Sequence, residues 1–434
     1  MTIGNFKINP IYVAFAGVVA SIFASFYISY ASAVGFVIGI AIIYFSDVED
    51  SYYFLFALIP FAFIFKLGSI STSLFTMLEY LVILKSIYTR KVVDSRYFLL
   101  ILPFVTIAVV SGFIVEDLGI TYIVRISLNV EMLYLFINHY YRKDSMKKIA
   151  YAMTVGLLVS DTIGLFRFRI PGFTNMYYDN NIVFIDYDVQ VHRFCGTFTD
   201  PNYFSMATIV ALGLIMALFF SGKGNLFFAL SGAALIVFGL MSYSKSFILM
   251  VVLLALVPLG YFMRRGNFLL LLFSLFVLIM VWESGILMKN HYIWSVVDRF
   301  TNGFNDDITS GRTEKWQLYF NSINSSIVVF LLGNGCAAPY VEEVAAHNII
   351  LDTWNYVGLL GVCAYAYMWT GAILSRKLIR PKLINWYLIA FIVVQYFFLN
   401  GFRAGELPFY LLCGWMVLNT DLIQKEEDPV PVSE

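Results

Sequence analysis

The sequence predicts an all-α fold, a polytopic transmembrane helical bundle of about 12–14 spans with two ordered loops on the non-cytoplasmic side. Of the 434 residues, 60% are hydrophobic and only 13% are charged, and the mean hydropathy is +0.79. Apolar runs long enough to span recur along the chain, and Lys and Arg gather between alternate runs. Soluble domains are about half apolar and about a quarter charged. We therefore treat residues 1–434 as a single integral-membrane domain.

The first element is expected to be a hairpin of two helices over residues 11–46. Only Lys7 precedes this apolar run, which is too long for the core of a cleavable signal peptide. It is also too long for one span, because about 20 residues cross the hydrocarbon. We place a tight turn near residues 30–32.

The remaining spans follow the later apolar runs. Several of these runs are short, about 16 residues, so one or two of them fit re-entrant or tilted segments. The spans are expected near residues 51–66, 70–88, 97–115, 120–140, 149–166, 203–220, 225–241, 246–262, 268–285, 347–373, 384–400 and 405–420.

Basic residues give the expected orientation. In this topology four basic clusters fall on one side, and the positive-inside bias makes that side the cytoplasm. Both termini are then cytoplasmic as well. The clusters are Lys85, Arg90, Lys91 and Arg96; Arg142, Lys143, Lys147 and Lys148; Arg264 and Arg265; and Arg376, Lys377, Arg380 and Lys382.

Two segments, residues 167–202 and 286–346, are too polar to span and fall on the outer side. Loops longer than about 15 residues on a compact protein are usually functional or disordered. Aromatic residues and glycine turns run through both segments, with no low-complexity sequence. We expect both external loops to be ordered and functional.

Several function classes find no support in the sequence. The formal net charge is zero, which gives no basic field for nucleic acid. No Gly-rich phosphate loop, zinc-type spacing or Gly-x-Ser-x-Gly elbow occurs. Asp186 and Asp188 have the spacing of a sugar-nucleotide metal site, but they lie outside, so a solvated acidic patch is favoured. Cys195 and Cys336 also lie outside, where a disulfide is permitted but cannot be read from spacing.

Three local patterns stand out in the second half of the chain. The first is Arg193-Phe-Cys-Gly-Thr-Phe-Thr-Asp-Pro-Asn202, immediately before an apolar run. The second is Ser310-Gly-Arg-Thr-Glu-Lys-Trp316, with Leu332-Gly-Asn-Gly335 downstream. The third is His347-Asn348, followed after nine residues by Gly358-Leu-Leu-Gly361.

In this order and on this side of the membrane, the patterns resemble those of the bacterial O-antigen polymerase and O-antigen ligase family. The His-Asn-x9-Gly-x-x-Gly spacing agrees at every fixed position, and the resemblance covers roughly residues 190–375. It implies a GT-C-like integral-membrane glycosyltransferase of the bacterial cytoplasmic (inner) membrane, active on the periplasmic side. The implied donor is an undecaprenyl-pyrophosphate-linked oligosaccharide, used without a metal or other cofactor. A chain-length regulator protein and a flippase are the implied partners, beside membrane lipid.

The resemblance and the side-chain chemistry together assign roles. Arg193 and Arg312 are placed on the donor pyrophosphate, because Arg is always charged and grips phosphate oxygens bidentately. His347 is expected either to take the proton of the acceptor hydroxyl or to orient the acceptor, since its unperturbed pKa near 6.5 leaves it largely neutral at pH 7. Further candidates for binding the pyrophosphate or sugar are Arg299, Arg403, Asn348, Asp200 and Asn202.

Each pattern also has a purely structural interpretation. Taken singly, the two arginines are ordinary loop residues paired with nearby acids or lipid phosphate, and His347 caps a helix. Gly358 and Gly361 form a small-residue packing face, and Asp200-Pro201-Asn202 begins a helix. The coincidence of all three patterns on one side favours the functional interpretation.

Four ionisable residues fall inside expected spans: Glu79, Arg125, Glu131 and Asp161. Such residues are costly in hydrocarbon and usually mark a pathway or an internal pair. Arg125 and Glu131 are six residues apart, about 600° around a helix, so they do not share a face. We expect each to pair with another span, and we favour structural pairing over a proton path.

The first functional hypothesis is a polymerase that joins lipid-linked repeat units of an O-antigen or related surface polysaccharide. An O-antigen ligase, which transfers the chain to lipid A–core, is the alternative within the family. A flippase or transporter for the same lipid-linked sugar is the alternative of another class. The Asp-Pro-Asn element is more typical of polymerases, and the His-Asn-x9-Gly-x-x-Gly spacing of ligases. Arginines in external loops favour an enzyme over a flippase.

Overall fold

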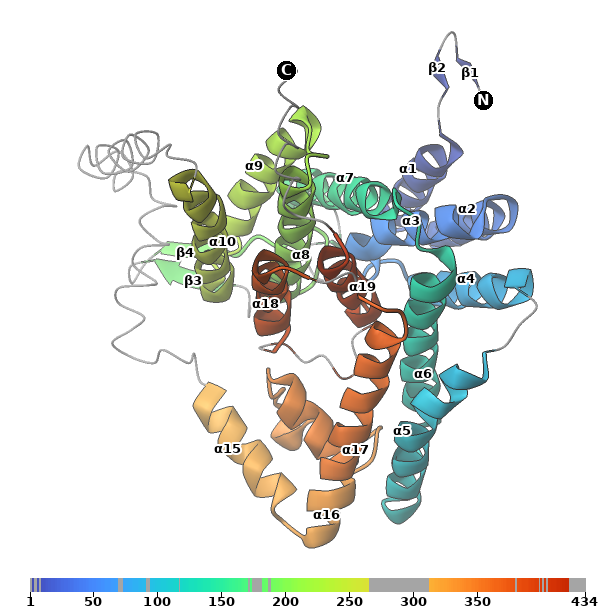
Figure 1. The fold of residues 1–434 in the computed structure, drawn as a ribbon, viewed down its shortest axis with the longest axis vertical. Helices are drawn as coiled ribbons and strands as arrows, with labels where there is room; N and C mark the ends of the chain where they lie inside the picture. The colour runs from blue at the N-terminus through green and yellow to red at the C-terminus, as the bar shows by residue number, and fades with distance from the viewer. Residues whose placement is uncertain are drawn as a thin grey trace, which may run out of the picture.

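The computed structural model is predominantly helical (Figure 1). Two short antiparallel hairpins accompany the helices: β1 (Thr2–Ile3) with β2 (Phe6–Lys7), and β3 (Ile182–Ile185) with β4 (Val189–His192). The structure describes residues 2–3, 6–7, 9–68, 73–90, 94–116, 118–170, 172–173, 182–185, 189–264, 312–378, 381–397, 399, 402 and 405–420.

The N-terminal hairpin is confirmed. Helix α1 (Pro10–Ala24) is followed by a turn and by α2 (Ala31–Phe45), and the two helices pack along each other. Tyr30, just before α2, has φ 68° and thus a left-handed backbone that reverses the chain. The turn spans residues 25–30, so it begins about five residues before the predicted position at 30–32, and residues 31 and 32 already belong to α2.

Five helices in the described part of the chain are long and apolar enough to cross a membrane. They are α5 (Ser95–Ile114), α6 (Ile120–Leu135, extended by a π-turn to Tyr140), α7 (Ser145–Leu165), α8 (Pro201–Phe220) and α17 (Ile349–Leu374). Length and composition therefore support a membrane protein. The total of about 12–14 spans stays a prediction.

Further helices pack in the same bundle. They are α4 (Leu74–Arg90), α9 (Leu226–Leu240), α10 (Lys245–Arg264), α18 (Leu383–Phe397) and α19 (Leu407–Leu418). The span expected at residues 51–66 is wrong in length, because α3 (Val48–Leu58) ends after 11 residues. Pro60 follows in a 3-10 turn, where its ring cannot continue an α-helix. Helix α3 is buried on most sides and so belongs to the protein core.

Helix α8 lies at the centre of one half of the molecule. It contacts α7, α9, α10, α18 and α19, which surround it in Figure 1. Most of its side chains are buried, so it faces protein on nearly every side. Its N-terminal end carries Asp200 and Asn202 of the first pattern.

A second group of helices forms the lower end of Figure 1. Helix α15 (Arg312–Ile323) and the short α16 (Ile327–Leu332) form a hairpin that packs on α17, while α5 runs beside α17. These helices carry the second and third patterns.

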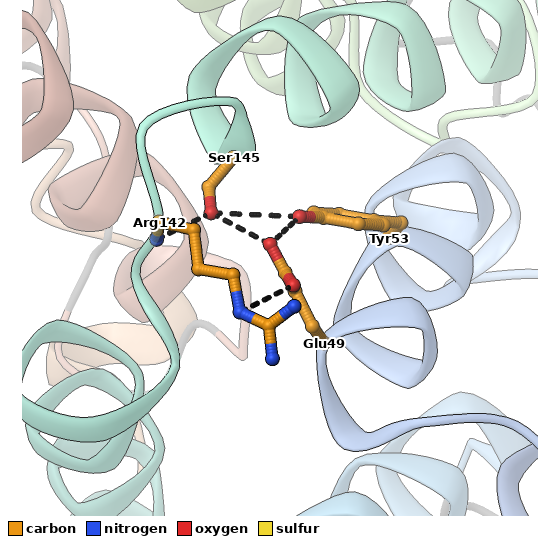
Figure 2. Close-up of polar contacts among 4 residues, drawn as sticks. All are labelled: Glu49, Tyr53, Arg142 and Ser145. Carbon is orange, nitrogen blue, oxygen red and sulfur yellow. Dashed lines mark hydrogen bonds and ion pairs between the residues drawn. The ribbon is translucent and has the colours of Figure 1, made fainter.

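Helix α3 is fixed to the start of α7 by a polar cluster (Figure 2). The Glu49 carboxylate accepts hydrogen bonds from Tyr53 and, at 2.8 Å, from the Ser145 hydroxyl. Arg142 Nε lies 3.3 Å from Glu49 Oε2, and the Arg142 backbone N–H donates to Ser145 Oγ at 2.8 Å. The buried carboxylate is thus satisfied on both oxygens, as its burial requires. These contacts fix the segment that begins the second basic cluster, of which Arg142 is the first residue.

Candidate active site

Helix α17 is broken at Gly358, which joins two helical segments. Its φ of 68° and ψ of −179° are not helical. A Cβ at this position would lie 2.2 Å from the backbone carbon of Leu331, so no other residue fits without movement. Gly358 therefore lets the α16 backbone approach α17 closely, as the packing interpretation expects, and it also joins the two helical segments.

The Leu332-Gly-Asn-Gly335 element packs directly against this break. The backbone N–H groups of Asn334 and Gly335 donate to the carbonyls of Asn355 and Tyr356, at 2.8 and 2.9 Å. These carbonyls lie in the last turn before the break, where a helix leaves such groups unpaired. The Asn334 side chain also donates to Asn355 Oδ1 at 2.9 Å. The second and third patterns thus form one structural unit.

A small separate core holds the segment before α17 against α15. The Trp316 indole donates to the Ala346 carbonyl at 2.9 Å, and the Tyr319 hydroxyl donates to the Val344 carbonyl at 3.0 Å. Tyr319 and Ala346 are both fully buried. These contacts bring His347, the next residue along the chain, beside the first turn of α15.

His347 is surrounded by charged residues of two other patterns. The pKa of its imidazole is lowered to about 4, chiefly by burial and also by the nearby Lys315 and Arg312, while Asp200 acts in the opposite direction. Burial also lowers the pKa of the Arg312 guanidinium, again opposed by Asp200. Each of the three patterns therefore contributes a residue to one place. At pH 7 the imidazole there is neutral.

The first pattern contributes Asp200, the N-cap of α8, to the surroundings of His347. Asp200 Oδ1 accepts the Asn202 backbone N–H at 2.6 Å. Arg193 lies behind it, only 9% exposed, with Nη2 donating to Asn202 Oδ1 at 3.3 Å and Nε donating to the Ser242 carbonyl at 2.8 Å. Arg193 thus holds the loop and the cap in position.

The residues expected from the sequence divide into three groups. Asp200, Arg312 and His347 come together, and Arg193 and Asn202 support Asp200. The Asn348 side-chain oxygen caps α17, accepting from the backbone N–H groups of Ile350 and Leu351 at 3.0 and 3.2 Å. Outside the described residues lie Arg299, Arg403, Asp186 and Asp188.

Sequence reasoning missed Lys315. It lies three residues after Arg312 on α15, so the two side chains share a helix face. The three-residue spacing is visible in the second pattern. Only the contact between α15 and the segment before α17, however, places Lys315 near His347. Arg312 and Lys315 thus act on His347 with two positive charges, opposed by the carboxylate of Asp200.

Three helix N-termini also meet at this site. Asp200 is the N-cap of α8, Arg312 is the first residue of α15, and His347 directly precedes the N-cap of α17. The N-terminal end of a helix carries a partial positive charge, which favours anions. The site is therefore suited to a ligand that carries more than one negative charge.

The charged residues inside the spans are mostly accounted for by internal pairing. Arg125 on α6 lies within the electrostatic range of Glu79 and Glu406, which come from other segments, and Glu131 interacts with Tyr97 on α5. Asp161 differs, because neither of its carboxylate oxygens has a hydrogen-bond partner in the described structure. The expected pairing is thus wrong for Asp161.

The cysteines are not cross-linked. Cys195 and Cys336 are both buried and form no disulfide with each other, and burial raises the pKa of the Cys195 thiol to about 12. The disulfide that an external location permits is therefore not formed.

Comparison with protein-family models, with curated protein sequences and with solved structures finds no match for the chain.

Proposed function

We propose that the protein is a membrane glycosyltransferase that uses a polyprenyl-pyrophosphate-linked oligosaccharide as donor and acts as a polymerase of repeat units. The grouping of Arg312, Lys315, Asp200 and neutral His347 at three helix N-termini carries this proposal. A pyrophosphate is the kind of dianionic group that such a site favours. The residue patterns that resemble the O-antigen polymerase and ligase family support the same substrate class.

In the proposed reaction the donor already contains its leaving group. A hydroxyl oxygen of the acceptor sugar forms a bond to the anomeric carbon, and the bond from that carbon to the pyrophosphate oxygen breaks. The hydroxyl proton passes to an imidazole nitrogen of His347. The released pyrophosphate carries the electron pair away, and Arg312 and Lys315 stabilise the developing charge.

The membrane setting fits this substrate. The helices that carry the site, α8 and α17, are candidate spans, so their N-terminal ends lie near a membrane surface. A lipid-linked donor can place its headgroup there while its tail stays in the bilayer. We place this site on the periplasmic face of the bacterial cytoplasmic membrane, with both termini cytoplasmic and a GT-C-like architecture.

The transporter alternative is less well supported. A flippase for an anionic headgroup needs positive charge along a path near the membrane midplane. Arg125, an arginine within the bundle, lies between the carboxylates of Glu79 and Glu406. Two acidic residues thus oppose this arginine, whereas at the candidate site Arg312 and Lys315 are opposed by Asp200 in their effect on His347.

The surface polysaccharide of a deletion strain of the source bacterium tests the proposal. A polymerase deletion should abolish the ladder of chain lengths and leave single repeat units on their final acceptor. Full-length chains left on the carrier lipid would identify a ligase instead. Repeat units trapped on the cytoplasmic leaflet would identify a flippase. An unchanged ladder would refute all three.

A further inference from the structure

An apolar groove lies between α1 and α7, outside the candidate active site. It holds about 610 Å³, and its lining is almost entirely hydrocarbon. Ala16 and Ala20, one turn apart and exposed on α1, form part of one wall; Val155, Val159 and Ile163 of α7 form the other. The small alanine side chains leave the groove open.

A cation lies at one end of the groove. Phe166 and Ile170 line this end, and the Arg169 guanidinium lies over the Phe166 ring, 5.9 Å from its centroid. Arg169 is exposed, and no carboxylate among the residues that the structure describes lies within ion-pair distance of it. The groove therefore joins an apolar channel to a positive charge.

This end of the groove is at the level where lipid headgroups lie. Helix α7 is a candidate span that ends at Leu165, and Arg169 follows four residues later. Arginines near the ends of spans extend to the interface, where lipid phosphates are found. The apolar walls then run from the headgroup level into the hydrocarbon.

The size of the groove indicates what occupies it. Along α1 the lining from Tyr12 to Phe23 spans roughly 16 Å at about 1.5 Å per residue. This length is close to one leaflet, about half of the 30 Å hydrocarbon core. One acyl chain fits these dimensions, and a long polyprenyl chain exceeds them.

We propose that the groove binds one acyl chain of an anionic phospholipid, whose phosphate rests on Arg169. This site is separate from the proposed donor site and does not depend on the proposed reaction. Its ligand class follows from the apolar walls, the length of one leaflet and the cation at the end.

Photo-crosslinking tests the proposal on the unmodified full chain. The protein is reconstituted in nanodiscs that contain phosphatidylglycerol with a diazirine in its acyl chain. Crosslinked peptides should map to α1 and α7, and excess unlabelled phosphatidylglycerol should compete. Crosslinks spread evenly over the apolar surface would overturn the proposal. So would competition by polyprenyl phosphate but not by phosphatidylglycerol.

Two variants, each with a matched control, sharpen the test. Ala20→Trp fills the groove and should abolish the α1–α7 crosslinks, whereas Ala229→Trp, at an exposed alanine of α9, should retain them. Arg169→Gln should lower the preference for phosphatidylglycerol over phosphatidylcholine by about fivefold. Arg96→Gln, at an exposed arginine of α5, should leave that preference unchanged. An unchanged preference in Arg169→Gln would contradict the headgroup assignment.

Discussion

At the scale of single residues, the environment of His347 sets what it can do. Burial, Lys315 and Arg312 all disfavour its protonated form, so its pKa lies at about 4, below the value that best suits a general base at pH 7. An anion bound to Lys315 and Arg312 would cancel much of their effect. Donor binding would then make the imidazole a stronger base when the substrate is in place.

This coupling predicts that inorganic pyrophosphate raises the pKa of His347 from about 4 toward the ordinary value near 6.5. The imidazole signals of the four histidines are followed by NMR across pH, and His347→Gln identifies the relevant one. Lys315→Gln should raise the pKa without any ligand, because one repelling charge is gone. A pKa that saturating pyrophosphate leaves unmoved would contradict an anion site beside His347.

The same pKa predicts a pH dependence of stability. The folded-state value of about 4 lies below the unfolded value near 6.5, so the unfolded chain binds the additional proton between these pH values. The contribution of His347 to stability should therefore fall as the pH drops from about 6.5 to 4. Thermal unfolding of the protein and of His347→Gln in detergent checks this. Identical pH profiles for the two proteins would exclude His347 as the source.

At the scale of elements, the break in α17 links two of the sequence patterns. The sequence predicted a helix over residues 347–373, and the structure has one at Ile349–Leu374, because a long apolar run is a strong local signal. The break itself could not be predicted, since it depends on the α16 segment that packs against it. Asn348 was predicted to bind the pyrophosphate or sugar, whereas in the structure its side chain caps α17, a role that depends on where the helix begins.

We predict that Gly358→Ala destabilises the protein by about 2 kcal/mol or more, since alanine is strained in the left-handed region and its Cβ meets the Leu331 backbone. Thermal unfolding in detergent measures the change. Gly213→Ala, in the middle of α8 with nothing within 4 Å of the added Cβ, is the control. It should be neutral or stabilising by up to about 1 kcal/mol. If the two substitutions changed the stability equally, the claim that the break in α17 requires glycine at position 358 would be contradicted.

At the scale of the whole molecule, composition was sufficient for the class of fold, but not for the site. Apolar runs identify membrane helices because lipid imposes both length and composition. The meeting of Asp200, Arg312 and His347 depends on tertiary contacts between helices that are distant in sequence. Arg193 was assigned to substrate, yet its buried guanidinium binds Asn202 and Ser242, an arrangement that no local pattern reveals.

The predicted orientation places the site and the basic clusters on opposite sides. A cysteine at Ser325, exposed after α15, should react with a membrane-impermeant maleimide in EDTA-permeabilised cells. A cysteine at Lys147, exposed near the start of α7, should react only after the membrane is disrupted. Both cysteines are introduced into a protein that carries Cys363→Ala, because the maleimide would otherwise label that exposed cysteine of α17. The reverse labelling pattern would invert the topology and place the site in the cytoplasm.

The central claim is that Arg312 and His347 belong to one site of glycosyl transfer. Its most direct test is chain extension by the purified protein in nanodiscs, with lipid-linked repeat units extracted from the source cells. The account predicts a ladder of polymer that persists in EDTA. Arg312→Ala and His347→Ala should lower the rate by about 10²–10³-fold, whereas Arg96→Ala, at an exposed residue of α5, keeps the full rate. Wild-type rates from both site variants at matched protein level would contradict the account.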